Sequence, residues 1–272
     1  MHGKKSAGTR SFLRSEVSQL GFAAIALALV SCGGTIKEPL EETLQQIYPL
    51  NSTAAVTITN QDGSIRIYGG GDELRVQATK KAYTAERLRQ IRINIATVGD
   101  SASIASDLPP KPKWGLSDRS GTVDYVVVVP ETARLVRAEL VNGELAVEGL
   151  RGQAVEARLG TGLLFARNCF SNLDLSLARG NINLFFDWWE NANFSVAGTV
   201  TRGNIWSFFP SNAAFRLQAE APNGRIANDF LEKEKRRAEA ANKIDMAIGE
   251  AGGVRVKIRA TNGNIRVAET NP

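Results

Sequence analysis

Side chains able to carry out catalytic chemistry are few in this chain of 272 residues, and their spacing does not bring them together. Cleavage of a polysaccharide would need two carboxylates that converge on one sugar bond, or a basic residue beside carboxylates that bind calcium. The available acids lie at different offsets from the glycines of a motif described below, so they should not line up. These acids are Asp174, Asp187, Glu190 and Asp229.

Histidine and cysteine chemistry is equally limited. The single histidine, His2, lies in a segment that we expect to be removed, which leaves no imidazole for a Ser-His-Asp triad or a zinc site. Of the two cysteines, Cys32 has the role described below, so Cys169 has no disulfide partner, and we interpret it as a small buried hydrophobe. Nucleophile-elbow, phosphate-binding and dinucleotide-binding motifs are missing as well, so we expect no catalytic residue, metal or cofactor.

Aromatic residues give the strongest indication of a functional surface. Alternate side chains of a strand point to opposite faces. An inward Ile182 therefore places Phe185 outward, and an inward Ile205 places Trp206 outward. Aromatics grouped on the exposed face of a rigid sheet mark binding surfaces more often than isolated ones do. With two tryptophans at the following corner, the candidate binding patch comprises Phe185, Trp188, Trp189, Trp206 and Phe208.

An alternative for this patch is burial, because residues 80–122 or residues 231–244 could fold over the same face. A second aromatic set lies six residues after three of the motif glycines. We expect it to form an internal column rather than a ligand site. This set comprises Phe186, Phe209 and Phe230.

The motif that positions these residues is a glycine corner between two half-buried strands. Glycine suits such a corner because it accepts a positive φ angle. The residue two positions after the glycine is aliphatic in every copy, and the apolar alternation changes phase across the corner. The corner glycines are Gly63, Gly143, Gly162, Gly180, Gly203, Gly224 and Gly263.

Most of these glycines are about twenty residues apart, a period typical of stacked repeats, since one unit cannot bury its own apolar face. We predict an all-β, single-domain β-solenoid in which the aliphatic residues after the corners lie above one another in neighbouring coils. Residues 254–267 should form the last coil. A leucine-rich repeat shares the period, but it would need a Leu-x-x-Leu-x-Leu signature and an asparagine ladder, and we find neither in the sequence.

Residues 1–31 have the features of a secretion signal. A basic start is followed by an apolar stretch from Leu20 to Val30, which is too short to cross a bilayer. The tetrapeptide Leu-Val-Ser-Cys that ends at Cys32 resembles the bacterial lipobox, whose cysteine becomes the lipidated first residue of the mature protein. Gly33 stands where an inner-membrane retention aspartate would be expected. By that resemblance the outer membrane or cell surface is the expected location.

Removal of this segment also changes the charge argument. The segment carries four basic residues and one acidic residue, so the mature chain has a net charge of +2 instead of +5. The high isoelectric point therefore belongs largely to the signal and gives no reason to expect nucleic acid as a partner.

The remaining chain divides into a tether and a folded domain. We interpret residues 32–53 as the lipidated cysteine and a spacer with at most a turn or two of helix, and residues 54–271 as the domain. Residues 80–122 interrupt the motif and should form an excursion or cap at the N-terminal end, with a short helix over 85–90. Residues 231–244 form a charged insertion, which we expect to be a solvated helix or loop; a basic site for anionic lipid or sugar is the alternative.

Several sequence features together resemble one known family. These are Val-Asp-Tyr at 123–125 before a valine run and a proline, Asn-Gly and Arg-Gly corners, Ala-Asn-Phe-Ser at 192–195, and Thr-Asn-Gly-Asn-Ile-Arg at 261–266. Over residues 54–268 the chain resembles the bacterial putative-adhesin domain of unknown function. The resemblance implies a right-handed β-solenoid exposed in the cell envelope, a role in adhesion and no agreed catalytic residues. Arg-Gly and Thr-Gly corners and the proline-rich excursion depart from that family's pattern.

These observations predict a non-enzymatic, lipid-anchored protein of the bacterial cell envelope that acts as an adhesin-like binding or scaffold module. The expected partners are the membrane, through the N-terminal lipid, and an envelope glycan or surface protein. A structural or stress-associated protein that assembles with itself is the alternative. A polysaccharide-degrading β-helix enzyme is a third, less favoured one.

Overall fold

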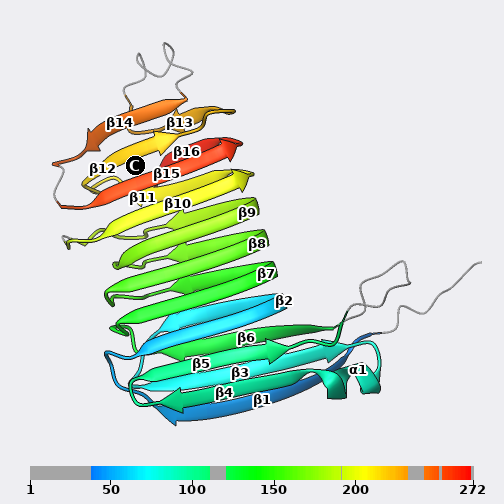
Figure 1. Cartoon of the computed structure of the whole chain (residues 1–272). Helices are drawn as coiled ribbons and strands as arrows, with labels where there is room; N and C mark the ends of the chain where they lie inside the picture. Colours follow the sequence, from blue (N-terminus) through cyan, green and yellow to red (C-terminus); the bar gives the residue numbers. More distant parts are fainter. Residues whose placement is uncertain (1–37, 111–120, 191, 232–241, 251–252, 271–272) are drawn as a thin grey trace, which may run out of the picture. The chain divides into compact units, whose positions relative to one another are not determined.

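The computed structural model describes residues 38–110, 121–190, 192–231, 242–250 and 253–270, and within them the chain is almost entirely β-structure (Figure 1). One sheet holds all 16 described strands, so the all-β prediction is confirmed. The short helix α1 (Ala85–Gln90) lies where the sequence predicted it. The strands are β1 (Leu40–Pro49), β2 (Ala55–Gly69), β3 (Glu73–Ala82), β4 (Arg92–Val98), β5 (Ser101–Asp107), β6 (Thr122–Val129), β7 (Leu135–Glu148), β8 (Ala154–Arg167), β9 (Asn172–Phe185), β10 (Ser195–Arg202), β11 (Ile205–Pro210), β12 (Phe215–Glu220), β13 (Ile226–Asn228), β14 (Lys243–Ile248), β15 (Arg255–Asn262) and β16 (Ile265–Thr270).

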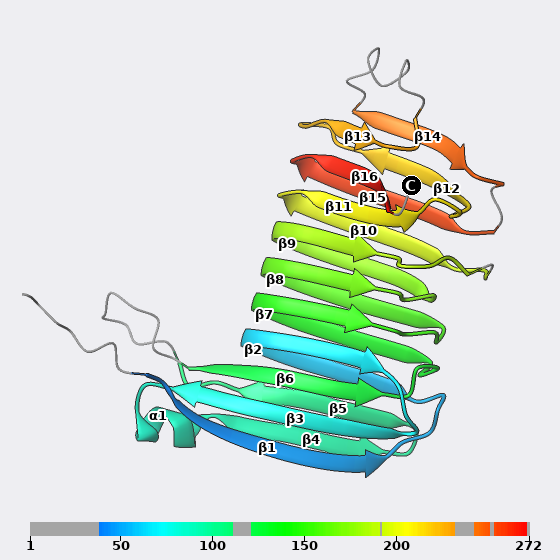
Figure 2. The same cartoon turned by 180° about the vertical axis from the view of Figure 1, so that it is seen from behind.

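Strands β2, β7, β8 and β9 form the centre of the sheet. They run parallel to one another, as Figures 1 and 2 show. Their pairing keeps the same register on both sides of the glycine corner. Four corner glycines therefore lie opposite one another on successive strands. They are Gly63, Gly143, Gly162 and Gly180.

Glycine is required at these corners for two reasons, which Gly180 illustrates. Its φ angle is +133°, a conformation that side-chain-bearing residues rarely adopt. A Cβ atom at Gly180 would also lie 1.8 Å from the carbonyl oxygen of Gly162. The backbones of neighbouring strands thus approach so closely at the corner that only glycine fits between them.

The aliphatic residue two positions after each corner glycine is buried, as predicted. Leu145 lies opposite Leu164, and Leu164 lies opposite Ile182. Ile182 in turn lies opposite Ile205 on β11. The side chains therefore form a continuous internal column, and their burial is the main source of stability for the stacked strands.

The order of the C-terminal strands differs from the sequence prediction. Strand β15 pairs in parallel with β10 on one side and with β12 on the other, and β16 lies between β11 and β13 in the same way (Figure 1). The strands around Gly263 are therefore inserted between those around Gly203 and Gly224, and the prediction that residues 254–267 end the stack was wrong. Ile265 consequently separates Ile205 from Ile226 in the internal column. The motif shows which strands stack, but it contains no information on their order.

The same insertion changes the predicted internal aromatic column. The rings of Phe186 and Phe209 stack at 5.5 Å between centroids, and both side chains are buried, as predicted. Phe230 does not continue this stack, because β16 places Glu269 opposite Phe209. Phe230 is only partly buried and reaches the column through Phe215, whose ring centroid lies 6.3 Å away.

The N-terminal part also departs from the prediction. Leu40–Pro49, expected to be part of a spacer, forms strand β1, which pairs antiparallel with β3 over its whole length. Ion pairs join the two strands, from Lys80 to Glu42 at 2.7 Å and from Lys81 to Glu41 at 3.2 Å. The polar alternation that suggested a tether is that of an exposed edge strand, whose side chains mostly face water.

Residues 80–122 contain the end of β3, α1, β4, β5 and the first residue of β6 among their described part. Strand β5 pairs with the first half of β2, and β6 pairs with its second half. The side of β2 that faces away from β7 is therefore covered by these strands (Figure 2). No described helix has the length and apolar character needed to span a membrane.

An asparagine ladder, which we did not find in the sequence, is present at three successive corners. The side-chain oxygen of Asn181 accepts a hydrogen bond from the backbone N–H of Asn204 at 3.2 Å. The side-chain oxygen of Asn204 accepts from the N–H of Asn264 at 2.9 Å, and that of Asn264 accepts from the N–H of Arg225 at 3.0 Å. The ladder satisfies backbone donors that the corner removes from the regular sheet pattern.

Candidate binding surface

Three phenylalanines form a row on the outer face of the sheet, which we call the outer aromatic row: Phe165 on β8, Phe185 on β9 and Phe208 on β11. The rings of Phe185 and Phe208 stack with centroids 4.4 Å apart and planes 7° apart. Phe165 lies 5.3 Å from Phe185. All three are partly exposed, so neither residues 80–110 nor β14 bury them completely. Phe165 was not among the predicted patch residues, although its offset from Gly162 matches that of Trp206 from Gly203.

Trp206 continues the outer face next to this row. It stands opposite Asn183 on one neighbouring strand and opposite Arg266 on the other, and 41% of its surface is exposed. A hollow of about 320 Å³ opens beside it. Besides Trp206, the hollow is lined by Arg225, Ile226, Ala227, Asn264, Ile265 and Arg266.

The structure does not bring Trp188 and Trp189 into this group. Trp188 is exposed, donates a hydrogen bond from its indole to Glu190 at 2.8 Å and packs on Phe170, with ring centroids 5.8 Å apart. Trp189 packs against the core, with rings of the internal column on several sides. In the described part of the chain no ring contact joins either tryptophan to Phe185 or Phe208, because the chain turns at a second corner directly after Phe186.

Three of the four acids considered for catalysis are engaged in separate contacts, and the fourth, Asp174, is exposed on β9. Asp187 accepts a hydrogen bond from Arg167 at 2.7 Å, and this contact lowers the pKa of its carboxyl group. Glu190 contacts Arg151 and Trp188, whereas Asp229 pairs with Arg266 at 3.6 Å. These acids do not converge on one point, and no group of three or more metal-binding side chains occurs among the described residues.

Opposite charges face each other across the outer side of the central strands. Arg66 pairs with Glu144 at 3.3 Å, and Arg137 pairs with Glu156 at 2.9 Å. The hydrogen bond from Arg137 lowers the pKa of Glu156. Each such exposed pair stabilises the fold only slightly. Their main effect is that the central strands present little net charge to a ligand.

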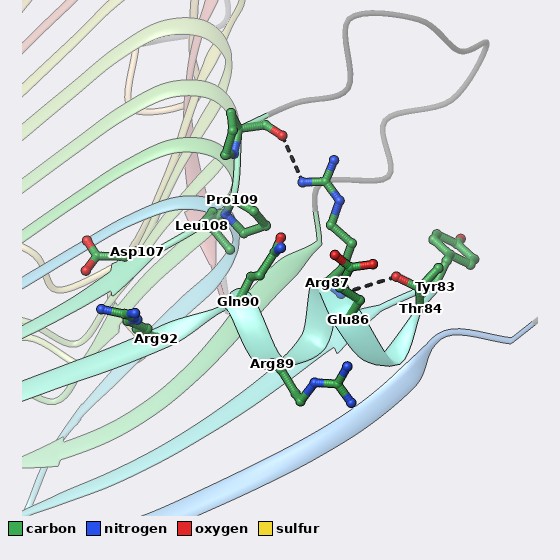
Figure 3. A pocket seen from close by; sticks show the side chains of 11 residues that line it. Tyr83, Thr84, Glu86, Arg87, Arg89, Gln90, Arg92, Asp107, Leu108 and Pro109 are labelled. Carbon is green, nitrogen blue, oxygen red and sulfur yellow. Dashed lines mark hydrogen bonds between the residues drawn. The ribbon is translucent and has the colours of Figure 1, made fainter.

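A larger cavity, of about 950 Å³, lies beside α1 (Figure 3). Arg87, Arg89 and Arg92 line it together with Glu86 and Asp107. The side chains do not converge. Arg87 donates a hydrogen bond to the backbone oxygen of Pro110 at 2.9 Å. Figure 3 shows the side chain of Arg89 pointing away from that of Arg87. The basic side chains at this cavity therefore do not form a shared site.

Cys169 is buried, as predicted, and burial raises the pKa of its thiol to about 11. The thiolate is the reactive form, so at pH 8 the native protein should react with a thiol reagent far more slowly than the unfolded protein. A Cys32→Ser variant leaves Cys169 as the single thiol, and absorbance of the released chromophore measures its labelling rate. Labelling that is as fast in buffer as in denaturant would show that the thiol is accessible.

Comparison with known proteins supports the fold. A putative cell adhesion protein from Clostridium sporogenes has a similar structure, with a TM-score of 0.51 and 15% sequence identity over 86% of this chain and 100% of its own. A putative adhesin from Bacteroides fragilis matches with a TM-score of 0.29 and 10% identity, over 85% of this chain and 99% of its own. A putative lipid binding protein from Parabacteroides distasonis matches with a TM-score of 0.30 and 8% sequence identity, over 85% of this chain and 97% of its own. These last two scores are too low to carry an argument.

No protein-family model matches the chain, and no curated protein matches it either. The structural likeness to the Clostridium sporogenes protein therefore concerns the fold and leaves the function to be argued from the surface of this chain.

Proposed function

We propose that this protein is a non-enzymatic, adhesin-like binding module of the bacterial cell envelope, built as a right-handed β-solenoid and anchored by a lipid on Cys32. Its outer face, formed by the outer aromatic row and Trp206, contacts an envelope glycan or a surface protein. The observation that carries the proposal is the row of three partly exposed phenylalanines in ring contact on a rigid sheet, together with the exposed Trp206 on β11.

Two further observations support this reading. Large aromatic side chains supply contact area at low conformational cost, because they have few rotatable bonds. Strands β8 and β9 pair over their whole length, and β11 pairs with β9 from Ile205 to Phe208, so the row is already ordered before a partner binds. In addition, three of the four carboxylates considered for sugar cleavage are engaged in separate contacts, which favours binding over catalysis.

Substitution of the outer aromatic residues tests the proposal. A variant with Phe185→Ser, Trp206→Ser and Phe208→Ser should lose most of its binding to bacterial envelope fragments, because the apolar contact area is removed. Sedimentation with the fragments measures the bound fraction. The matched control is Tyr83→Ser, which removes an exposed aromatic residue beside α1. Unchanged binding by the triple variant, with a native circular dichroism spectrum, would rule out this face.

The lipid anchor requires its own test, since Cys32 lies outside the described residues. In a bacterial host, the unmodified chain should fractionate with membranes, and Cys32→Ser should move it to the soluble periplasmic fraction. Loss of the acyl chains removes about 0.8 kcal/mol of membrane affinity per buried methylene group. Ser31→Ala, which leaves the cysteine in place, serves as the control. Retention of the Cys32→Ser variant in membranes would contradict lipid anchoring there.

Self-assembly is the second candidate function, favoured by strand β1. Within the described part of the chain β1 pairs with β3 on one side, and its Ile47 is 62% exposed. A free strand edge with an exposed apolar residue is a template for pairing with another chain. Light scattering tests this: an assembly that Ile47→Lys dissolves would support the candidate, and a strictly monomeric protein would reject it.

A further inference from the structure

The hollow beside Trp206 differs from the rest of the outer face in its charge. Along the central strands each arginine considered above, such as Arg66 or Arg137, faces a carboxylate. Beside Trp206 the balance changes. Arg225 takes part in no ion pair among the described residues, and Arg266 reaches only Asp229, at 3.6 Å. The hollow therefore combines an exposed indole with two guanidinium groups that are not fully neutralised.

The strand register explains why the hollow forms at this place. Trp206 on β11, Arg266 on β16 and Ala227 on β13 lie in one row across three neighbouring strands, all on the outer face. The small side chain of Ala227 leaves space beyond Arg266. Arg225 precedes β13 and borders the same space. The inserted strand β16 thus places Arg266 between the tryptophan and the alanine.

Asn264 adds a hydrogen-bond donor to the hollow. Its side-chain oxygen is used by the asparagine ladder, where it accepts from the backbone N–H of Arg225. The amide NH₂ of Asn264 makes no hydrogen bond within the described part of the chain. The ladder fixes the orientation of this amide. Its two N–H groups remain available to a ligand.

The same corner carries further positive charge. Arg179 and Arg202 occupy the same register position on β9 and β10, and both are exposed. Neither takes part in an ion pair among the residues that the structure describes. Two like charges side by side on adjacent strands destabilise the sheet slightly, so their pairing here is more easily explained by an anionic partner than by folding.

We propose that this hollow binds an acidic glycan, with a uronate carboxylate held by Arg225 and Arg266 and the sugar ring lying on the indole of Trp206. The proposal rests on the proposed function and specifies its ligand. Arginine matches a carboxylate with two parallel hydrogen bonds. Trp206 is 41% exposed and lines the hollow, so part of its indole is accessible to the apolar side of a sugar.

An acidic glycan fits the surface better than a nucleic acid does. Bases would need several open aromatic faces on which to stack. Phe185 and Phe208 cover each other's faces at 4.4 Å, and only part of the Trp206 indole is accessible. The expected net charge of the mature chain, +2, is also too small for the strong phosphate attraction that non-specific nucleic-acid binding requires.

Titration of the full-length protein with polygalacturonate, followed by tryptophan fluorescence or calorimetry, tests the proposal. Fully methyl-esterified polygalacturonate has the same backbone without the charge and should bind at least tenfold more weakly, since the charge-assisted hydrogen bonds are lost. Arg225→Gln and Arg266→Gln should each weaken binding of the acidic polymer about tenfold. Arg255→Gln, an exposed arginine on β15, is the matched control and should leave affinity unchanged.

The outcomes separate this proposal from the broader one. Equal binding of the two polymers, no binding of either, or unchanged affinity in both arginine variants would overturn the acidic-glycan proposal. If the triple aromatic variant still loses envelope binding in that case, the proposed function stands without it. Stronger binding of a single-stranded oligonucleotide or of anionic lipid vesicles than of polygalacturonate would also overturn it. The supporting result is weaker polygalacturonate binding by natively folded Arg225→Gln and Arg266→Gln, with unchanged binding by Arg255→Gln.

Discussion

Replacing Gly180 by alanine should destabilise the protein by about 4 kcal/mol or more, a large part of the stability of a typical domain. The Cβ atom would lie 1.8 Å from the carbonyl oxygen of Gly162, which is backbone and cannot rotate away. The φ angle of +133° adds strain. The strands β8 and β9 would have to separate at the corner, with loss of the hydrogen bonds beside it. Denaturant unfolding followed by circular dichroism measures the change.

Gly70→Ala is the matched control, because no heavy atom outside Gly70 and its two chain neighbours lies within 4 Å of the position that its Cβ would take. It follows β2 in a loop and should change the free energy of unfolding by less than about 0.5 kcal/mol. A Gly180→Ala variant as stable as Gly70→Ala would mean that the corners do not require glycine. The close approach of β8 and β9 at the corner would then be contradicted.

Phe209→Ala should cost about 3–5 kcal/mol of stability, because it removes a large side chain from a closed core. Phe209 is fully buried and contacts three rings, those of Phe186, Trp189 and Phe215. No nearby side chain can fill the space without breaking its own packing. The variant should therefore unfold at a clearly lower temperature than the original protein in a thermal unfolding measurement.

The neighbouring residue provides the comparison. Phe208 lies on the outer face and is partly exposed, so Phe208→Ala should cost only about 1 kcal/mol. The difference between two identical substitutions in adjacent positions tests which face of β11 points inward. Similar losses for both variants, or a larger loss for Phe208→Ala, would reverse the assignment.

The sequence predicted the local geometry of the corners well, since that geometry depends on neighbouring residues. Only glycine accepts the positive φ angle together with the contact to the next strand. Alternation then decides which side chains face inward, and residues such as Leu145 and Ile182 are buried accordingly. The helix over 85–90 could be predicted for the same reason, because Thr84 caps it locally through the backbone N–H of Arg87.

Long-range order could not be predicted in this way. Ile265 lies between Ile205 and Ile226 because β16 pairs with both β11 and β13. The sequence could not predict this order, since every copy of the motif forms a strand with a similar edge for pairing. Leu40–Pro49 has too few buried side chains to indicate a strand, and its pairing with β3 is visible only once β3 is in place.

The candidate surface was predicted in part. The alternation of side chains along a strand correctly placed Phe185 and Phe208 on one face, where their rings stack. Trp188 and Trp189 were added only as residues of the following corner, and neither joins the group, because β9 ends at Phe185 and the chain turns after it. The arginines beside Trp206 could not be recognised, since their proximity depends on the insertion of β16 between β11 and β13.

The insertion of β15 and β16 has a consequence for the folding pathway. Strands β12 and β13 have their parallel neighbours only in residues that follow them in the chain. The edges of β10 and β11 therefore stay open until β15 and β16 pair with them. A chain cut short before Arg255 would leave those edges unpaired, and an unpaired strand edge is a template for aggregation.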